Sequence, residues 1–146
     1  MPDLVKEAKV WEAAGVSFGE YEMMVLIKSI KKLALTSGAS QLRVWGKIRG
    51  TKKDYYIVEG QLAAGEEAEG GGATEVEGME PRGSGINKNV YWVTNSPLSD
   101  WTMLPDLKPM DIKNARSIKY MFCGEIESKI YTNPFFFETE KTYLRA

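Results

Sequence analysis

Apolar residues recur at helical spacing at the start of the chain. Leu4, Ala8 and Trp11 lie at positions i, i+4 and i+7, with charged residues between them. This spacing places all three on one side of a helix and predicts a short amphipathic helix. Gly15 is expected to follow the end of that helix, because glycine readily adopts the left-handed conformation found there.

A second helix is predicted to begin with a capping box, in which Ser17 and Glu20 stand three residues apart. Its apolar residues lie along one side and are Met23, Leu26, Ile27, Ile30, Leu33 and Ala34. Gly38 is expected to end this helix. Residues 1–40 are therefore predicted to form a helical segment.

From residue 41 the apolar period changes to two, which is typical of a half-buried strand. The outer face of this strand carries basic and aromatic side chains, namely Arg43, Trp45, Lys47 and Arg49. After a turn, a second strand begins at Tyr55, so residues 41–62 are predicted to form an antiparallel hairpin. A third strand, Asn89–Thr94, is almost continuously apolar, which indicates burial on both faces.

Residues 63–86 interrupt the predicted sheet. They are rich in glycine, and between residues 62 and 85 six glutamates stand against the single base Arg82, a net charge of −5. The other residues carry 14 acids and 18 bases, a net charge of +4. Such a segment has too little apolar surface to offset the entropy of ordering, so we expect a flexible acidic loop. It is interpreted first as a solvated insertion and second as a tether for a basic partner.

The C-terminal region, residues 87–146, is predicted to contain the third strand, one helix and a C-terminal strand region. The helix is expected to begin near Pro109, and a fourth strand is expected at residues 120–122. The predicted fold class is α+β, with two N-terminal helices, an antiparallel sheet of about four strands interrupted by the acidic glycine-rich loop, and one further helix. All of these elements are assigned to one domain.

The composition excludes several kinds of chemistry. The 146 residues contain no histidine and one cysteine, so an imidazole base and an internal disulfide are both impossible within this chain. No phosphate-binding glycine motif and no EF-hand loop is present. We therefore expect no enzyme activity, no catalytic residues, no cofactor and no metal. No apolar stretch is long enough for a membrane span or a signal peptide, so the expected compartment is the cytoplasm.

The basic and aromatic residues of the hairpin are the main candidates for binding. The candidate interface consists of Arg43, Trp45, Lys47, Arg49, Tyr55 and Trp101. A tryptophan framed by cations is typical of an anchor in a protein interface. The alternative is a single-stranded nucleic-acid-binding module, in which the cations neutralise phosphates and the aromatic rings stack on bases. A protein partner is favoured over nucleic acid, since the acidic loop would compete for the same face.

Several ordered blocks of the chain resemble one known family. The blocks span nearly the whole chain and are Pro2–Leu4, Glu12–Val16, Leu42–Ile48, Asp54–Gly60, Gly85–Val93, Ala115–Lys119 and Tyr143–Ala146. In this order and approximate spacing they are similar to the radial spoke head protein 4/6 family of cilia and flagella. Members of that family are generally longer, so the resemblance implies the N-terminal part of a longer protein, a short relative or a trimmed form.

The resemblance implies a structural role without enzyme activity. The expected function is that of a subunit of the radial spoke head in the axoneme, which scaffolds head assembly and conveys mechanical signals between the central pair and the dynein arms. The implied partners are other radial spoke head subunits, including a like subunit, with transient contact to central pair projections. The implied location is the cytoskeleton of the cilium or flagellum, with neither a nucleic acid nor a membrane as partner.

Overall fold

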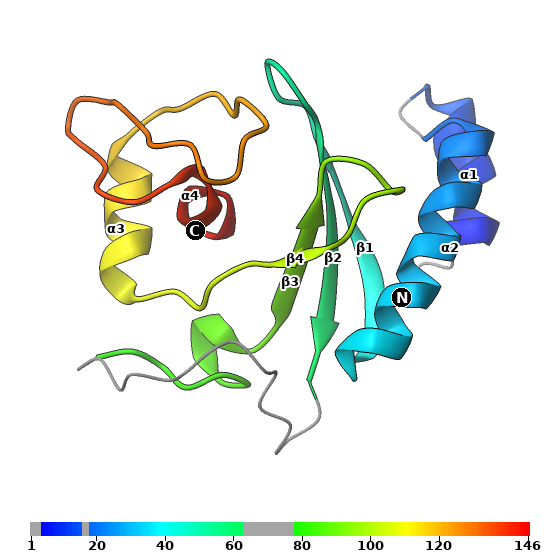
Figure 1. The fold of residues 1–146 in the computed structure, drawn as a ribbon, viewed down its shortest axis with the longest axis horizontal. Coiled ribbons are helices and arrows are strands. Elements are labelled where there is room, and N and C mark those ends of the chain that lie inside the picture. The colour runs from blue at the N-terminus through cyan, green and yellow to red at the C-terminus, as the bar shows by residue number, and fades with distance from the viewer. Residues whose placement is uncertain (1–3, 16–17, 63–77) are drawn as a thin grey trace.

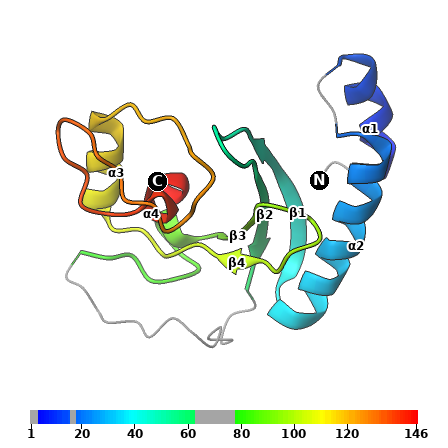
Figure 2. The same cartoon turned by 45° about the horizontal axis from the view of Figure 1, so that its top comes forward.

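An antiparallel sheet lies between two helical layers in the computed structural model of the chain (Figures 1 and 2). The structure describes residues 4–15, 18–62 and 78–146. Its elements, in chain order, are α1 (Leu4–Ala13), α2 (Glu20–Ser37), β1 (Ser40–Ile48), β2 (Tyr55–Gln61), η1 (Gly85–Asn87), β3 (Val90–Thr94), β4 (Thr102–Met103), α3 (Pro109–Ser117) and α4 (Glu140–Arg145). The strand order in the sheet is β1-β2-β3-β4. The predicted α+β fold class is confirmed.

The two faces of the sheet hold separate cores because side chains alternate along each strand. On the α2 face, Val58, Val90 and Trp92 pack with Leu33 of α2. On the α4 face, the core consists of Tyr55, Ile57, Val93 and Leu104, with Leu144 of α4 packed against it. A third cluster, made by Ala115, Ile118, Ile130 and Phe136, joins α3 to the C-terminal segment. The predicted burial of both faces of the third strand is confirmed.

The second helix begins later than its capping box predicts. Gly19 occupies the N-cap position of α2, and the main-chain N–H of Met23 donates to the Gly19 carbonyl at 2.9 Å. The predicted cap Ser17 lies outside the described residues. Gly38 ends the helix with φ of 62°, as expected from the sequence. Leu26 and Leu33 are buried, whereas Ala34, which the apolar pattern places on the same side, is exposed.

The fourth strand is β4, so the prediction of a strand at residues 120–122 is wrong. Met103 pairs with Trp92, and Thr102 pairs with Val93. The main chain near residue 122 instead binds the β1–β2 turn, where the Thr51 N–H donates to the Phe122 carbonyl at 2.9 Å. The rings of Tyr120 and Phe122 pack against Tyr143. The aromatic side chains of residues 120–122 therefore pack in an aromatic cluster, and their main chain does not form a strand.

The structure extends into the predicted acidic loop from its C-terminal side. Residues 63–77 lie outside the described residues, but residues 80–87 make specific contacts. Asn87 is fully buried, and its side chain donates to the carbonyls of Glu80 and Leu107 at 2.9 and 3.0 Å. Its side-chain oxygen accepts the Leu107 N–H at 2.8 Å. The boundary predicted at residue 86 therefore falls inside the hydrogen-bonded turn η1.

No helix in the described part of the chain is both long and apolar enough to span a membrane. Within residues 4–15, 18–62 and 78–146, no three Cys, Asp or Glu side chains are grouped so that they could hold a metal ion.

Candidate protein-interaction surface

The predicted basic and aromatic face of β1 is divided by a β-bulge at Trp45. Val44 pairs with Val58 and Gly46 pairs with Ile57. Between these two pairs β1 therefore has one extra residue, Trp45, which has no partner on β2. The extra residue reverses the direction of every later side chain in the strand. Arg43 therefore shares the α4 face with Glu59, whereas Lys47 lies with Tyr56 on the α2 face.

Arg43 is held in a bidentate ion pair on the α4 face. Its guanidinium donates to both carboxylate oxygens of Glu59, at 2.6 to 2.9 Å. Asn89 donates to the same carboxylate at 2.5 Å. The hydrogen bonds and charge of Glu59 raise the pKa of Arg43. The Glu59 side chain is 6% exposed, so this pairing is what makes its burial tolerable.

Lys47 is engaged on the opposite face. Its ammonium group lies 2.7 Å from Glu22 of α2 and 3.3 Å from Asp54. Tyr56 also donates a hydrogen bond to Glu22. Burial alone would lower the pKa of Lys47, but the contacts with Glu22 and Tyr56 outweigh it and raise that pKa. Because Arg43 and Lys47 point to opposite faces and both pair with carboxylates, the continuous cationic surface required by the nucleic-acid alternative is not formed.

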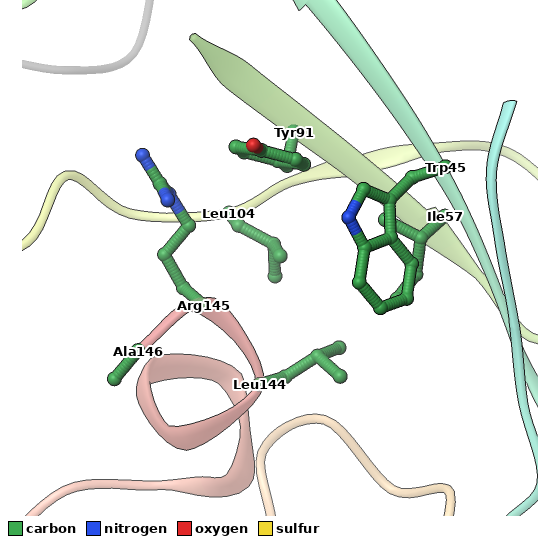
Figure 3. A pocket seen from close by; sticks show the side chains of 7 residues that line it. All are labelled: Trp45, Ile57, Tyr91, Leu104, Leu144, Arg145 and Ala146. Atoms are coloured by element: carbon green, nitrogen blue, oxygen red, sulfur yellow. The ribbon is translucent and has the colours of Figure 1, made fainter. Parts of the chain in front are cut away.

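Trp45 stands at the mouth of a hollow between the sheet and α4 (Figure 3). The indole is 55% exposed, although it is a large apolar side chain. The hollow has a volume of about 230 Å³, and its lining includes Tyr91 of β3 and Leu144 and Arg145 of α4. It has room for one side chain of a partner. Among the six predicted interface residues, Trp45 is the one that lines this hollow.

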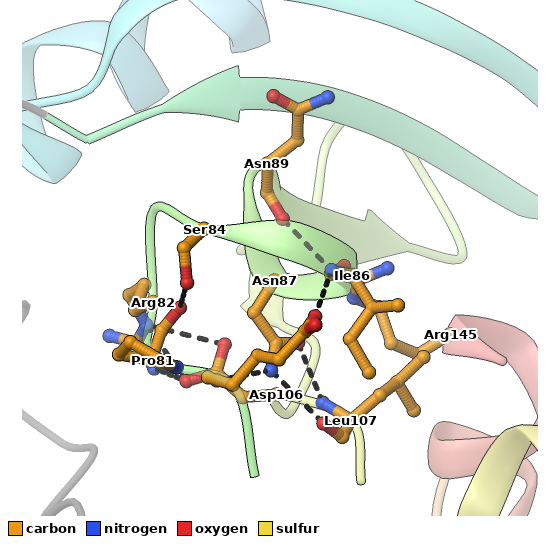
Figure 4. A network of polar contacts seen from close by, with 10 residues as sticks. Pro81, Arg82, Ser84, Ile86, Asn87, Asn89, Asp106, Leu107 and Arg145 are labelled. Carbon is orange, nitrogen blue, oxygen red and sulfur yellow. Dashed lines mark hydrogen bonds and ion pairs between the residues drawn. The ribbon is translucent and has the colours of Figure 1, made fainter. Parts of the chain in front are cut away.

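Arg145 closes one side of this hollow and fixes α4 to the sheet. Its guanidinium stacks on the Tyr91 ring at 4.5 Å and donates to the carbonyls of Ile86 and Asn89, each at 3.1 Å. Figure 4 shows the hydrogen bonds of Arg145 beside the hydrogen-bonded turn around Asn87. Burial lowers the pKa of Arg145, and the nearby charges and the Tyr91 ring oppose that shift. The signal for this residue in the sequence was the block Tyr143–Ala146.

A salt bridge supports the same turn from its outer side. Arg82 lies 2.8 Å from Asp106, and both side chains are less than one quarter exposed. This pair fastens the C-terminal part of the acidic segment to the loop before α3 (Figure 4). The hydrogen bonds of Arg145 and the ion pair between Arg82 and Asp106 therefore stabilise this region separately.

The other predicted interface residues lie apart from this hollow. Arg49 is exposed at the end of the hairpin strand. Tyr55 is 1% exposed and belongs to the core of the α4 face, where burial and the charge of Glu140 raise its pKa. Trp101 packs against the core of the α2 face, and its indole N–H donates to Ser29 at 2.8 Å. The structure therefore does not unite the six predicted residues in one surface.

A buried carboxylate organises the C-terminal layer, and no local sequence pattern distinguishes it. Glu140 is fully buried and accepts hydrogen bonds from the main-chain N–H groups of Cys123 and Gly124 at 2.8 and 3.2 Å. The Cys123 thiol donates to the same carboxylate at 2.7 Å. These contacts attach the start of α4 to the segment that binds the hairpin turn. Glu140 serves as a structural anchor.

A second exposed aromatic group lies on the C-terminal segment and was not among the predicted interface residues. Tyr131, Phe135 and Phe137 are 79%, 52% and 83% exposed. Their rings touch in sequence, with centroids 6.5 Å apart for Tyr131 and Phe135 and 4.9 Å for Phe135 and Phe137. The signal in the sequence was the run of three phenylalanines, of which only Phe136 is buried. Exposed aromatic rings are enriched at protein interfaces.

Comparison with known proteins assigns the family. The model of the radial spokehead-like protein family matches residues 1–80 and 73–146 of this chain. The chain therefore belongs to the radial spokehead-like protein family.

Individual relatives agree with this assignment. Radial spoke head protein 6 homolog A and radial spoke head protein 4 homolog A, both from Homo sapiens, are 31% and 30% identical over the whole of this chain. Flagellar radial spoke protein 4 from Chlamydomonas reinhardtii is 36% identical over 79% of it. The chain covers 26%, 24% and 27% of these relatives, so it spans about a quarter of their length.

Proposed function

We propose that this chain is a non-enzymatic structural part of the radial spoke head in the axoneme of cilia or flagella. In this role it scaffolds the spoke head and conveys mechanical signals between the central pair and the dynein arms during motility. The observation that carries the proposal is the agreement of the whole chain with proteins named for the radial spoke head. The exposed side chain of Trp45 beside a braced hollow supports a role in binding other proteins.

The proposed partners are other radial spoke head subunits, including a like subunit, with transient contacts to central pair projections. Two exposed aromatic sites on different elements, Trp45 on β1 and the Tyr131, Phe135 and Phe137 group, support contact with more than one neighbour. Aromatic side chains offer large contact area at low cost in conformational entropy. The charged residues around them set orientation and encounter rate more than affinity.

The proposal is tested by locating the protein in the cell. The native protein, tagged in its own ciliated or flagellated cells, is expected in the detergent-insoluble axoneme and is expected to be released together with other radial spoke proteins. Cells that lack it should beat abnormally. A tagged protein that restores beating but stays entirely in the soluble fraction would show that the proposed function is wrong.

A further inference from the structure

One flank of α2, next to its buried side, borders a long groove. The opposite wall is the loop between β3 and β4, which lies beside α2 in Figures 1 and 2. The groove has a volume of about 690 Å³, three times that of the hollow at Trp45. Its lining runs along α2 from Tyr21 to Thr36, a distance of about 22 Å at the helical rise per residue.

The groove is apolar inside and held in shape by the fold. Leu33, which is 6% exposed, and Trp101 contribute to its lining and also pack in the core of the α2 face. The hydrogen bond from the Trp101 indole to Ser29 ties the loop wall to α2. Tyr21 and Leu98, 75% and 78% exposed, offer further apolar surface on opposite walls. A partner would therefore meet a preformed site and lose little to ordering it.

Lysines give this groove a positive rim. Lys28 and Lys32 both line it, four residues apart on α2, and both are exposed. Lys32 reaches Asp100 across the groove at 3.5 Å, but these two side chains are 76% and 97% exposed. An ion pair in such contact with water contributes little, so a closer carboxylate from a partner can replace it.

We propose that this groove binds an acidic amphipathic helix of a partner protein. The partner helix would lay its apolar side on Leu33, Trp101 and Leu98 and direct carboxylates to Lys28 and Lys32. The wall formed by α2 is about 22 Å long, which equals four helical turns, and an amphipathic helix in a hydrophobic groove is a recurring mode of recognition. The same lysines disfavour α2 of a second copy, because pairing the two helices would place like charges together. The concave shape suits a helix better than a membrane surface.

Binding is tested with a designed probe. A fluorescein-labelled helical peptide of about 16 residues, with leucines along one side and glutamates flanking them, is titrated with the chain at low salt while anisotropy is recorded. We expect saturable binding that Lys28→Glu combined with Lys32→Glu weakens about tenfold or more, because like charges then face one another. Leu98→Asp should also weaken binding. The matched control is Lys113→Glu combined with Lys119→Glu, an equal charge change at exposed lysines outside the groove.

Three results would overturn the proposal once circular dichroism has confirmed that every variant is folded. The first is no saturation up to about 1 mM chain, which corresponds to negligible affinity. The second is equal loss of binding in both pairs of lysine variants, and the third is equal binding of a peptide with lysines in place of its glutamates. Capture of phosphatidylserine vesicles that depends on Lys28 and Lys32, without peptide binding, would identify a membrane site instead. The inference does not rest on the axonemal proposal, so either can fail alone.

Discussion

Lys47, Glu22 and Tyr56 form a small polar group that joins β1 and β2 to α2. Glu22 accepts hydrogen bonds from both of the other side chains. Burial acts to raise the pKa of Glu22, but the hydrogen bonds and the charge of Lys47 outweigh it and hold that pKa below the ordinary value of a glutamate. The carboxylate form is thus preferred more strongly in the folded protein, which links folding stability to pH.

Glu22→Gln should therefore change how stability responds to acid. A lowered folded-state pKa contributes stability that is present above the ordinary pKa of a glutamate and is lost as pH falls through the folded-state pKa. We expect the variant to lose about 1 kcal/mol at neutral pH and to show a shallower decline in acid. Urea unfolding at several pH values measures both effects. Glu138→Gln, at an exposed position, is the control. An equally steep acid decline in the Glu22 variant would contradict this explanation.

Arg145 allows a second test on a single side chain. Arg145→Met keeps much of the aliphatic stem but removes the donors to Ile86 and Asn89 and the charge stacked on Tyr91. We expect a loss of about 1–3 kcal/mol in unfolding free energy, since two partly buried carbonyls lose a charged donor. Arg116→Met, at an exposed position of α3, should change it by less than about 0.5 kcal/mol. Equal losses in the two variants would mean that Arg145 does not brace α4.

Among the elements, the turn between β1 and β2 depends on Gly124. This residue has φ of +94°, and a side chain on it would collide with the carbonyl of Lys53. Gly124 also offers its own carbonyl to Asn95, which donates to Asp54 as well. One position therefore holds the hairpin turn, the β3–β4 loop and the C-terminal segment together.

Gly124→Ala and Gly83→Ala separate two effects of adding a methyl group. Gly83 has a similar φ of +87°, but nothing lies within 4 Å of its added carbon. We expect Gly83→Ala to cost about 1 kcal/mol from backbone strain alone. Gly124→Ala should cost clearly more, about 3 kcal/mol, because the collision with main-chain atoms adds to that strain. Denaturant unfolding of both variants measures the difference. Similar losses would show that the turn moves aside freely.

The sequence predicted the elements whose signal is local and repeated. The α2 helix, the hairpin strands, β3 and the start of α3 at Pro109 follow from periodicity and end signals. The strand β4 and the helix α4 have two and six residues, which is too short for a period to emerge. The bulge at Trp45 was hidden because the alternating letters on β1 do not show which residue lacks a partner on β2.

The difference between local patterns and long-range pairing also explains why the structure separates the residues of the candidate interface. Composition drew attention to Trp45, which the structure leaves 55% exposed, but alternate positions on β1 do not all share a face because of the bulge. Arg43 and Lys47 acquire their partners Glu59 and Glu22 from β2 and α2, which only the tertiary structure brings near. Glu140 likewise becomes a buried anchor through contacts with residues sixteen and seventeen positions away. Long-range pairing of this kind leaves no local pattern in the sequence.

At the scale of the whole molecule, the surfaces that we propose for binding lie on the helical layer and on the C-terminal layer. The groove along α2 has a basic rim, while the hollow at Trp45 lies on the other side of the sheet, toward α4 (Figures 1 and 3). A domain with separate binding surfaces on its two sides is well suited to a scaffold, because two neighbours can bind without competing.

Trp45→Ala should separate binding from folding. The side chain is 55% exposed, so we expect the unfolding free energy to change by less than about 1 kcal/mol. If Trp45 is an interface anchor, affinity for purified radial spoke head subunits should fall more than tenfold, about 2 kcal/mol. Met110→Ala, at a residue 58% exposed on α3, is the control. Calorimetric titration gives the affinities, and unchanged binding by the Trp45 variant would exclude it as an anchor.

The bulge also bears on how this strand should be aligned with others. Trp45 is the surplus residue of β1, so a version of the strand that lacks it would keep Arg43 opposite Glu59 and Lys47 opposite Tyr56. Loss of a residue after Gly46 would instead move the side chains that follow it to the opposite face of the sheet. Deletion of the residue at position 45 therefore leaves the strand pairing intact, whereas deletion two positions later does not.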